Sequence, residues 1–177
     1  MTTLFNTVSA ESLKDNFFSR LDRDWMLITA GTMAHFNTMT ASWGTLGILW
    51  NKPVAICFIR PQRFTFQFAE KHAFYTLSFL EEQYRDILDF CGSHSGKDTD
   101  KVSQTGLKPV ELGAESITFE QARLVIECRK LYADFIKPEN FLVREIMEKN
   151  YPGKDFHRFF IGEIVNCYSS SSPFSIL

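Results

Sequence analysis

Hydrophobic and polar positions alternate along much of this chain, as they do in β-strands with one buried face. Residues 25–30 alternate in this way, and residues 123–135 do so over a longer and partly exposed run. Residues 54–59 are instead a short run of β-branched and aromatic side chains, which indicates a buried strand. Further strands are predicted at 73–79, 108–112, 117–119 and 159–168. Short strands with turn residues between them predict a mainly β protein, built as a closed or nearly closed barrel.

Helical spacing is rarer and the predicted helices are short and peripheral. They fall at 62–71, 81–90, a turn that Gly106 closes, and 139–149. Residues 31–37 read as a turn or bulge, and 39–50 as extended chain interrupted by Gly44 and Gly47. We expect one domain over 1–177, with residues 1–10 irregular within a lead-in of about 1–20 and a flexible tail over 169–177.

Composition adds an aromatic bias to this picture. Of the 177 residues, 15% are aromatic, and 18 are Phe. Such a content indicates a thick aromatic core, or an aromatic-lined pocket or interface. Core packing is the better explanation for most of these rings.

Charge and cysteine content exclude several classes of protein. The formal net charge is −2 and no basic stripe occurs, so binding to nucleic acid has no electrostatic support. Neither a signal peptide nor a membrane-spanning apolar run is present, which favours the cytoplasm and no membrane contact. The four widely spaced cysteines show no zinc-binding spacing and are expected to be reduced thiols.

Common catalytic and nucleotide motifs are missing. The sequence has no dinucleotide-binding glycine fingerprint after a strand and no phosphate-binding loop. Its four histidines are scattered without metal-ligand spacing, and no nucleophile elbow occurs. A Rossmann domain, a P-loop NTPase, a zincin-like metal site and a hydrolase triad are therefore not predicted.

One stretch, residues 37–65, carries the candidate chemistry. In an extended chain, Thr38, Thr40 and Ser42 share one face, so their hydroxyls could bind a polyol or a heteroaromatic edge. Asn37, Met39, Ala41 and Trp43 share the other face. An exposed threonine-rich strand face is an equally ordinary explanation of this pattern.

The same stretch ends in a basic segment. Arg60 and Arg63 flank a predicted strand-to-helix junction, and Thr65 follows them. Free N–H groups at a helix start favour anions, and arginine adds charge there, as a monophosphate site requires. A pair of surface arginines is as good an explanation on spacing alone.

Four segments together resemble a known family. Residues 37–44, 60–65 and 95–107 are similar to segments of the flavin reductase-like, FMN-binding split-barrel family, with the flavoredoxin branch as the nearest match. Residues 160–165 resemble that family's closing strand. The similarity covers about residues 20–168, in the family's order.

The resemblance implies a fold, a cofactor and a site. The fold would be a six-stranded split β-barrel with Greek-key connections and short peripheral helices, working as a homodimer with FMN near the interface. Asn37, Met39, Thr40, Ala41, Ser42 and Trp43 would line the flavin ring and ribityl chain; Arg60, Arg63 and Thr65 would hold the phosphate end; Ser95 and Lys101 would lie close by. His157 is a further candidate for ring contact or interface packing.

Four functions remain open on this basis. The first is an FMN-dependent oxidoreductase with NADH or NADPH as electron donor, a flavin reductase. The second is a flavoredoxin-type protein that exchanges electrons with a redox protein partner and turns over no nicotinamide. A split barrel adapted to another ligand such as haem, and a barrel serving as an interaction module, are the others. Arg63 and Thr65 argue against the last.

Overall fold

A computed structural model describes residues 4–113 and 116–171, and most of them lie in antiparallel strands and short helices. The main sheet has eight strands: β1 (Phe5–Val8), β2 (Met26–Thr32), β3 (His35–Ala41), β4 (Gly44–Leu49), β5 (Lys52–Ile59), β6 (Phe74–Leu80), β9 (Ala122–Phe135) and β10 (Arg158–Ser170). A hairpin of β7 (Pro109–Leu112) and β8 (Ser116–Phe119) forms a second sheet. The mainly β prediction is confirmed, although the sheet has eight strands where six were expected.

The sheet closes on itself with a seam. Its order is β3-β2-β6-β9-β10-β5-β4, with β1 added on β10. β3 and β4 are thus the two ends of this path, yet only Ser42 and Trp43 separate them in the chain. Two residues cannot span a flat sheet of this width, so the sheet must curl until its two ends meet. No backbone pairing between β3 and β4 occurs in the described chain, which leaves a split barrel.

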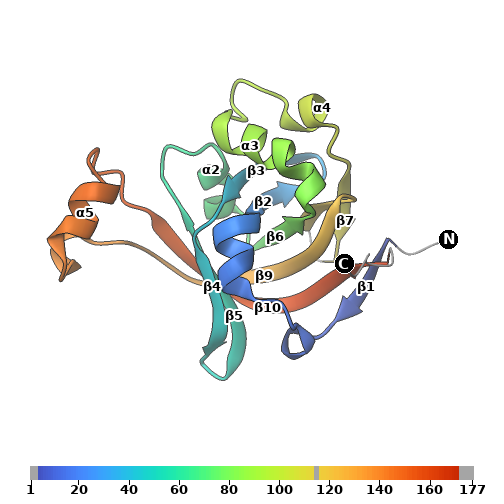
Figure 1. The fold of residues 1–177 in the computed structure, drawn as a ribbon, viewed down its shortest axis with the longest axis horizontal. Coiled ribbons are helices and arrows are strands. Elements are labelled where there is room, and N and C mark those ends of the chain that lie inside the picture. Colours follow the sequence, from blue (N-terminus) through green and yellow to red (C-terminus); the bar gives the residue numbers. More distant parts are fainter. Residues whose placement is uncertain (1–3, 114–115, 172–177) are drawn as a thin grey trace.

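Short helices surround the barrel (Figure 1). They are α1 (Phe17–Ser19), α2 (Thr65–Lys71), α3 (Arg85–Ser93), α4 (Lys101–Thr105) and α5 (Arg144–Asn150). Shorter helical turns are η1 (Ala10–Ser12), η2 (Arg20–Asp24), η3 (Glu82–Tyr84) and η4 (Pro138–Asn140). None of the described helices is long and apolar enough to cross a lipid bilayer.

One segment leaves the body of the molecule. Residues 136–157, between β9 and β10, form an arm that carries α5 away from the barrel (Figure 1). The helix predicted at 139–149 is shorter than expected, because η4 comes first and α5 begins only at Arg144. α2 likewise begins at Thr65 and not at Gln62, which leaves the two arginines of that region in a connection.

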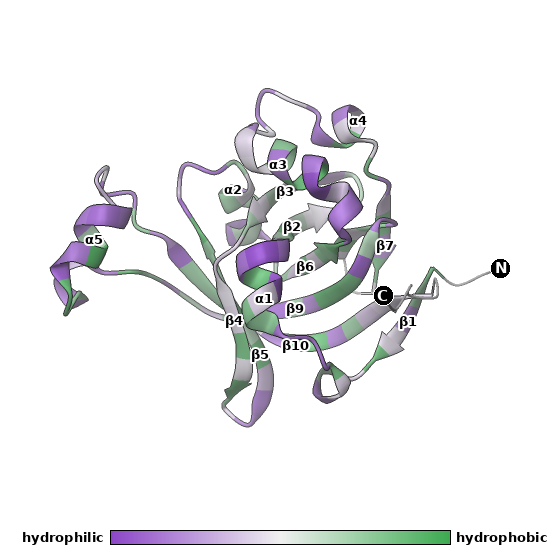
Figure 2. Cartoon of the chain, in the orientation of Figure 1, coloured by the Kyte–Doolittle hydropathy of each residue, from purple (hydrophilic) through white to green (hydrophobic). Residues whose placement is uncertain are grey.

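The core fills the inside of the barrel. Its largest fully buried side chains include Tyr75, Phe79, Phe160 and Ile126. A smaller cluster, with Leu88 and Phe119, lies under α3. Figure 2 shows hydrophobic and hydrophilic residues mixed along β9 and β10, as expected for strands with one face toward this core.

Both chain ends are more regular than expected. The prediction of an irregular lead-in was wrong at residues 5–8, because β1 pairs there with Cys167–Ser170 of β10. The prediction of a flexible tail was wrong at Ser169 and Ser170, which pair with β1 in the same ladder. This interaction joins residues 159 to 165 positions apart, so local sequence could not indicate it. The docking of Phe174, Ile176 and Leu177 lies outside the described residues.

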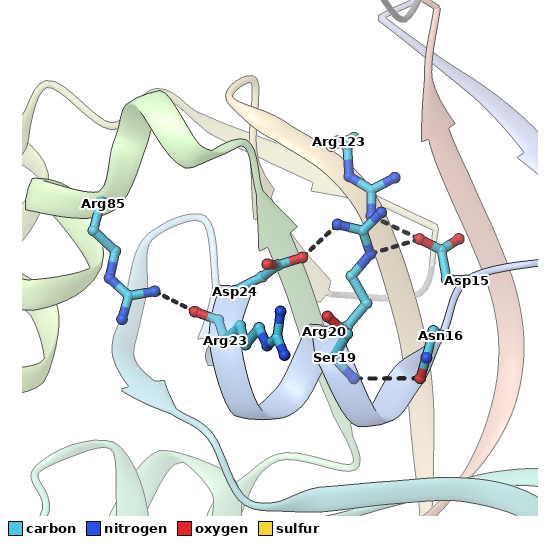
Figure 3. Close-up of polar contacts among 8 residues, drawn as sticks. All are labelled: Asp15, Asn16, Ser19, Arg20, Arg23, Asp24, Arg85 and Arg123. Carbon is cyan, nitrogen blue, oxygen red and sulfur yellow. Dashed lines mark hydrogen bonds and ion pairs between the residues drawn. The ribbon is translucent and has the colours of Figure 1, made fainter. Parts of the chain in front are cut away.

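An ionic cluster fastens the N-terminal segment to the barrel (Figure 3). The carboxylate of Asp15 accepts hydrogen bonds from Arg20 at 2.7 Å and from Arg123 of β9 at 2.8 Å. Burial alone would raise the pKa of Asp15, but the hydrogen bonds from these two arginines lower it below its usual value. Arg85 of α3 donates to the carbonyl of Arg23 and completes the attachment.

Candidate functional site

A cavity opens at the seam of the barrel, which we call the seam cavity. Its volume is about 300 Å³. Nine residues line it: Met39, Thr40, Ala41, Ser42, Trp43, Phe58, Arg60, Arg63 and His157. They come from the end of β3, the crossing to β4, the end of β5 and the residue before β10. The cavity therefore lies where the two ends of the sheet meet.

Aromatic rings form one wall of the seam cavity. The Trp43 and His157 rings lie 5.0 Å apart between centroids, and Phe58 meets His157 edge-on at 6.5 Å. Trp43 is 44% exposed, so its ring is accessible from the cavity mouth. Flat apolar surface of this kind suits a planar heteroaromatic ligand.

Two arginines form the other end. Both sit on the connection from β5 to α2, where the chain turns away from the sheet. Arg60 pairs with Asp155 of the arm and donates to the carbonyl of Asn150 at 2.9 Å. Arg63 donates to the carbonyl of Gly92 at 2.7 Å, and burial lowers its pKa. These contacts hold the guanidinium groups in place, and neither Nε has a partner among the hydrogen bonds of the described residues.

His157 is held as a neutral imidazole. Burial, and then the charge of Arg60, lower the pKa of His157 from 6.5 to about 4. Its Nδ1 lies 2.9 Å from the hydroxyl of Tyr151. When the phenol donates to Nδ1, the ring proton resides on Nε2, which makes Nε2 a hydrogen-bond donor.

A buried lysine lies beside this site. The ammonium of Lys101 donates to the carbonyls of Thr38 at 2.8 Å and Cys91 at 2.9 Å. Cys91 also accepts a longer contact from Arg63 at 3.4 Å, so two cations meet at the end of α3. Burial is the main cause that lowers the pKa of Lys101 from 10.5 to about 8, and Arg63 lowers it further. Such a concentration of positive charge favours an anion nearby.

The structure brings most of the predicted site residues together. Seven of them line the seam cavity: Met39, Thr40, Ala41, Ser42, Trp43, Arg60 and Arg63. Asn37, Thr65, Ser95 and Lys101 are not among its lining residues. Their contact with a cofactor stays a prediction.

Two of these four residues, Asn37 and Thr65, join β3 to the start of α2. The amide of Asn37 donates to the hydroxyl of Thr65 at 2.7 Å, and both side chains are buried. Gly96 lies so close that a Cβ there would come within 1.9 Å of the side-chain oxygen Oδ1 of Asn37. The loop that contains Ser95 is therefore packed directly on β3, while the Ser95 side chain itself is exposed.

Two hydroxyls of the predicted row form hydrogen bonds within the protein, and ligand binding by the row stays a prediction. Thr38 Oγ1 lies 2.8 Å from Thr29 Oγ1 inside the sheet, and Thr40 Oγ1 donates to the carbonyl of Leu88. Both hydroxyls thus form hydrogen bonds inside the protein. Of the row, only the Ser42 side chain has no partner among the hydrogen bonds of the described residues.

Phe58 is a cavity residue that the sequence reading missed. It is half-buried on β5 and alternates with the buried Cys57 and Ile59, so it points to the other face of the sheet. A phenylalanine on the outward face, two residues before Arg60, was the available signal. In the parts of the chain that the structure describes, no group of three acidic, His or Cys residues could hold a metal ion.

The chain is similar to known proteins in its sequence pattern and in its fold. The family model described as "Flavin reductase like domain" matches residues 18–176. No curated protein is detectably similar in sequence. Several solved structures share the fold at low identity.

Three of these structures illustrate the range. A flavoredoxin from Methanosarcina acetivorans is 18% identical, with a TM-score of 0.66 over 85% of this chain and 70% of that one. An FMN-binding domain of a flavin reductase-like enzyme from Shewanella baltica is 16% identical, with a TM-score of 0.67 over 97% and 80%. The NADH:FAD oxidoreductase SgcE6 of Streptomyces globisporus is 16% identical, with a TM-score of 0.63 over 84% and 76%.

At these identities the structures establish the fold, and the family model establishes kinship. Since that model spans residues 18–176, nearly the whole chain, the protein belongs to the flavin reductase-like family of split barrels.

Proposed function

We propose that the protein binds FMN in the seam cavity and acts as an NAD(P)H-dependent flavin reductase. The observation that carries this proposal is the pairing, in one cavity, of an aromatic wall and a two-arginine end. Trp43 and Phe58 suit the flavin ring, while Arg60 and Arg63 suit its phosphate. The residues present therefore fit FMN.

The bound flavin would supply the redox chemistry, accepting a hydride from NADH or NADPH and passing electrons on. The protein's own residues would bind and orient. Trp43 and Phe58 keep water from one side of the ring site, and Arg63 anchors the anionic end. The neutral imidazole of His157 offers a hydrogen bond from Nε2 without adding a charge.

A second function is a flavoredoxin-type electron carrier without nicotinamide turnover. The 44% exposure of Trp43 favours it, because a redox protein partner could approach the cofactor edge there. The fold similarity to a flavoredoxin is compatible with either function.

The protein would work as a homodimer with FMN near the interface. The arm carries Leu142 at 99% and Val143 at 51% exposure, apolar surface that a second copy would cover. The seam cavity, at about 300 Å³, is at the small end of cofactor sites, and a second copy would enlarge its walls. The buried, unpaired thiols of all four cysteines support the cytoplasm as its compartment.

Arg63→Ala tests the phosphate assignment. We expect the free energy of FMN binding to weaken by about 1.5–3 kcal/mol, because a charge-assisted contact is lost. Calorimetric titration of the apoprotein with FMN measures this change. Arg144→Ala removes an exposed arginine of α5 and should bind FMN as the unchanged protein does. Equal affinity of both variants would refute the assignment.

Reduction of the bound flavin separates the two functions. The FMN-loaded protein is mixed anaerobically with NADH or with NADPH, and the flavin absorbance is followed. Bleaching by either nicotinamide supports the reductase. A flavin that stays oxidised with both, but is reduced by dithionite, supports the electron carrier.

A further inference from the structure

A second, larger cavity adjoins the seam cavity on the side of the arm. Its volume is about 520 Å³. We call it the apolar groove, and it is lined by Phe18, Leu21, Asp22, Ser42, Trp43, Gly44, Phe58, Ile136, Phe141, Ile146, Asn150 and Tyr151. These residues come from the N-terminal helical turns, the seam and the arm. Nine of these twelve residues lie outside the lining of the seam cavity.

The lining of the groove is mostly apolar. Most of its side chains are aromatic or aliphatic, and Phe18 is 90% exposed at the edge. Among the described residues, neither Lys nor Arg lines the groove, and Asp22 is its only charged side chain. A phosphate-bearing molecule, such as a flavin nucleotide or a nicotinamide dinucleotide, would find no cation there and would meet a carboxylate. The groove therefore suits an uncharged, apolar molecule.

The groove communicates with the seam cavity. Ser42, Trp43 and Phe58 line both spaces. A molecule in the groove would thus contact the same two rings that we assign to the flavin. The volume of about 520 Å³ falls within the usual range for small-molecule sites.

The outer wall of the groove is held in position. Arg60 pairs with Asp155 and donates to the carbonyl of Asn150 at 2.9 Å, which ties the arm to the end of β5. Phe141 and Tyr151 pack edge-on with centroids 6.0 Å apart. The wall is therefore formed before any ligand arrives, which lowers the entropic cost of binding.

We propose that the apolar groove binds an uncharged aromatic small molecule and places it beside the flavin. Its position next to a flavin rests on the proposed function, whereas its binding does not. Leu142 and Val143, proposed to contact a second copy, are exposed on the same arm but do not line the groove.

The test uses the intact apoprotein and two inert probes of the same ring size. Naphthol is uncharged at neutral pH, and naphthalene sulfonate is its anionic counterpart. Equilibrium dialysis should give saturable binding of naphthol, and binding of the sulfonate at least about tenfold weaker, because the groove has no cation to pair with it.

Matched substitutions locate the binding. Ile146→Lys places a charge in the groove from a residue that is 52% exposed, and should weaken naphthol binding by about tenfold or more. Ile48→Lys makes the same change on β4, where Ile48 is 72% exposed and outside the groove, and should leave binding within about twofold. Phe18→Lys repeats the test from the opposite wall, should the arm variant fold poorly.

The outcomes separate this proposal from the proposed function. Equal binding by Ile146→Lys, Phe18→Lys and the unchanged protein would overturn the groove assignment, as would equal affinity for the two probes. Dissociation of a dimer by naphthol, seen by sedimentation velocity, would show that a second copy occupies the groove and would also overturn it. Failure to bind FMN refutes the proposed function alone. A shift of the bound-flavin absorbance on adding naphthol to the FMN-loaded protein would support the adjacency.

Discussion

Residues at and beside the seam differ in their exposure to solvent. Trp43 is partly exposed, whereas His157 is buried against it and kept neutral. Lys101 is a buried cation whose ammonium is satisfied by backbone carbonyls. Burial therefore sets the protonation of the site, and pH and substitution can test that separately.

His157 makes stability sensitive to mild acid. Its pKa is about 4 in the folded protein, against 6.5 as the ordinary value, so the unfolded chain binds the proton more tightly. The free energy of unfolding therefore decreases as the pH falls from 6.5 toward 4. Above pH 6.5 the imidazole is neutral in both states, and His157 causes no loss of stability. We expect a loss of about 1–2 kcal/mol, since partial solvent access reduces the full effect.

Urea unfolding at several pH values measures this dependence. His157→Gln should have a flatter profile between pH 6.5 and 4. His72→Gln, on a histidine outside the seam cavity, should keep the profile of the unchanged protein. An identical slope for His157→Gln would contradict the assignment.

Lys101→Met tests the buried ammonium. The substitution leaves the carbonyls of Thr38 and Cys91 without their donor, so we expect the free energy of unfolding to fall by about 1–3 kcal/mol. Urea unfolding at neutral pH checks this. Lys97→Met, on an exposed lysine of the same loop, is the control and should be nearly neutral. A higher free energy of unfolding in Lys101→Met would show that burying the ammonium destabilises the protein more than its two hydrogen bonds stabilise it.

At the scale of elements, the site depends on three segments that meet. β3 and its crossing to β4 supply Trp43 of the aromatic wall, the β5–α2 connection supplies the arginines, and the 94–100 loop packs against β3. Asn37 links the first two through its hydrogen bond to Thr65, and Gly96 allows the loop to approach Asn37. The close approach explains why a glycine is needed there.

Gly96→Ala should disturb both fold and site. Its new Cβ would lie 1.9 Å from Oδ1 of Asn37, so this side chain must move and its hydrogen bond to Thr65 is strained or lost. We expect a loss of stability of about 1–3 kcal/mol and weaker FMN binding. Gly47→Ala, where nothing lies within 4 Å of the added Cβ, is the matched control. Thermal unfolding and FMN titration distinguish the two, and similar behaviour would refute the contact.

At the scale of the whole molecule, the arm is tied to the barrel by Arg60 but leaves apolar side chains exposed. It carries α5 away from the barrel and exposes Leu142 and Val143 (Figure 1). An isolated chain would leave this apolar surface in water. A homodimer that buries it is the arrangement we propose.

Leu142→Glu combined with Val143→Glu should abolish that dimer. Both positions are exposed in the single chain, so the fold should survive while charge repulsion opposes association. Sedimentation velocity should give a dimer for the unchanged protein and a monomer for the variant. Glu145→Gln with Glu148→Gln, on the same arm, should remain dimeric. A monomeric unchanged protein would refute the proposal.

The sequence by itself determined the strand content, the candidate stretch and the kinship. Alternation and β-branched runs are local patterns, so β2, β5, β6 and β9 could be predicted close to their observed bounds. The motifs at 37–44 and 60–65 are also local, and seven of eleven predicted site residues line one cavity.

Only the tertiary structure decided which side chains are available. The hydroxyls of Thr38 and Thr40 form hydrogen bonds with Thr29 and Leu88, and no local pattern identifies these partners. The pairing of β1 with β10, the arrival of His157 beside Trp43 and the apolar groove all join distant segments. Curling of the sheet at Ser42 and Trp43 brings them together, because two residues must connect its opposite ends.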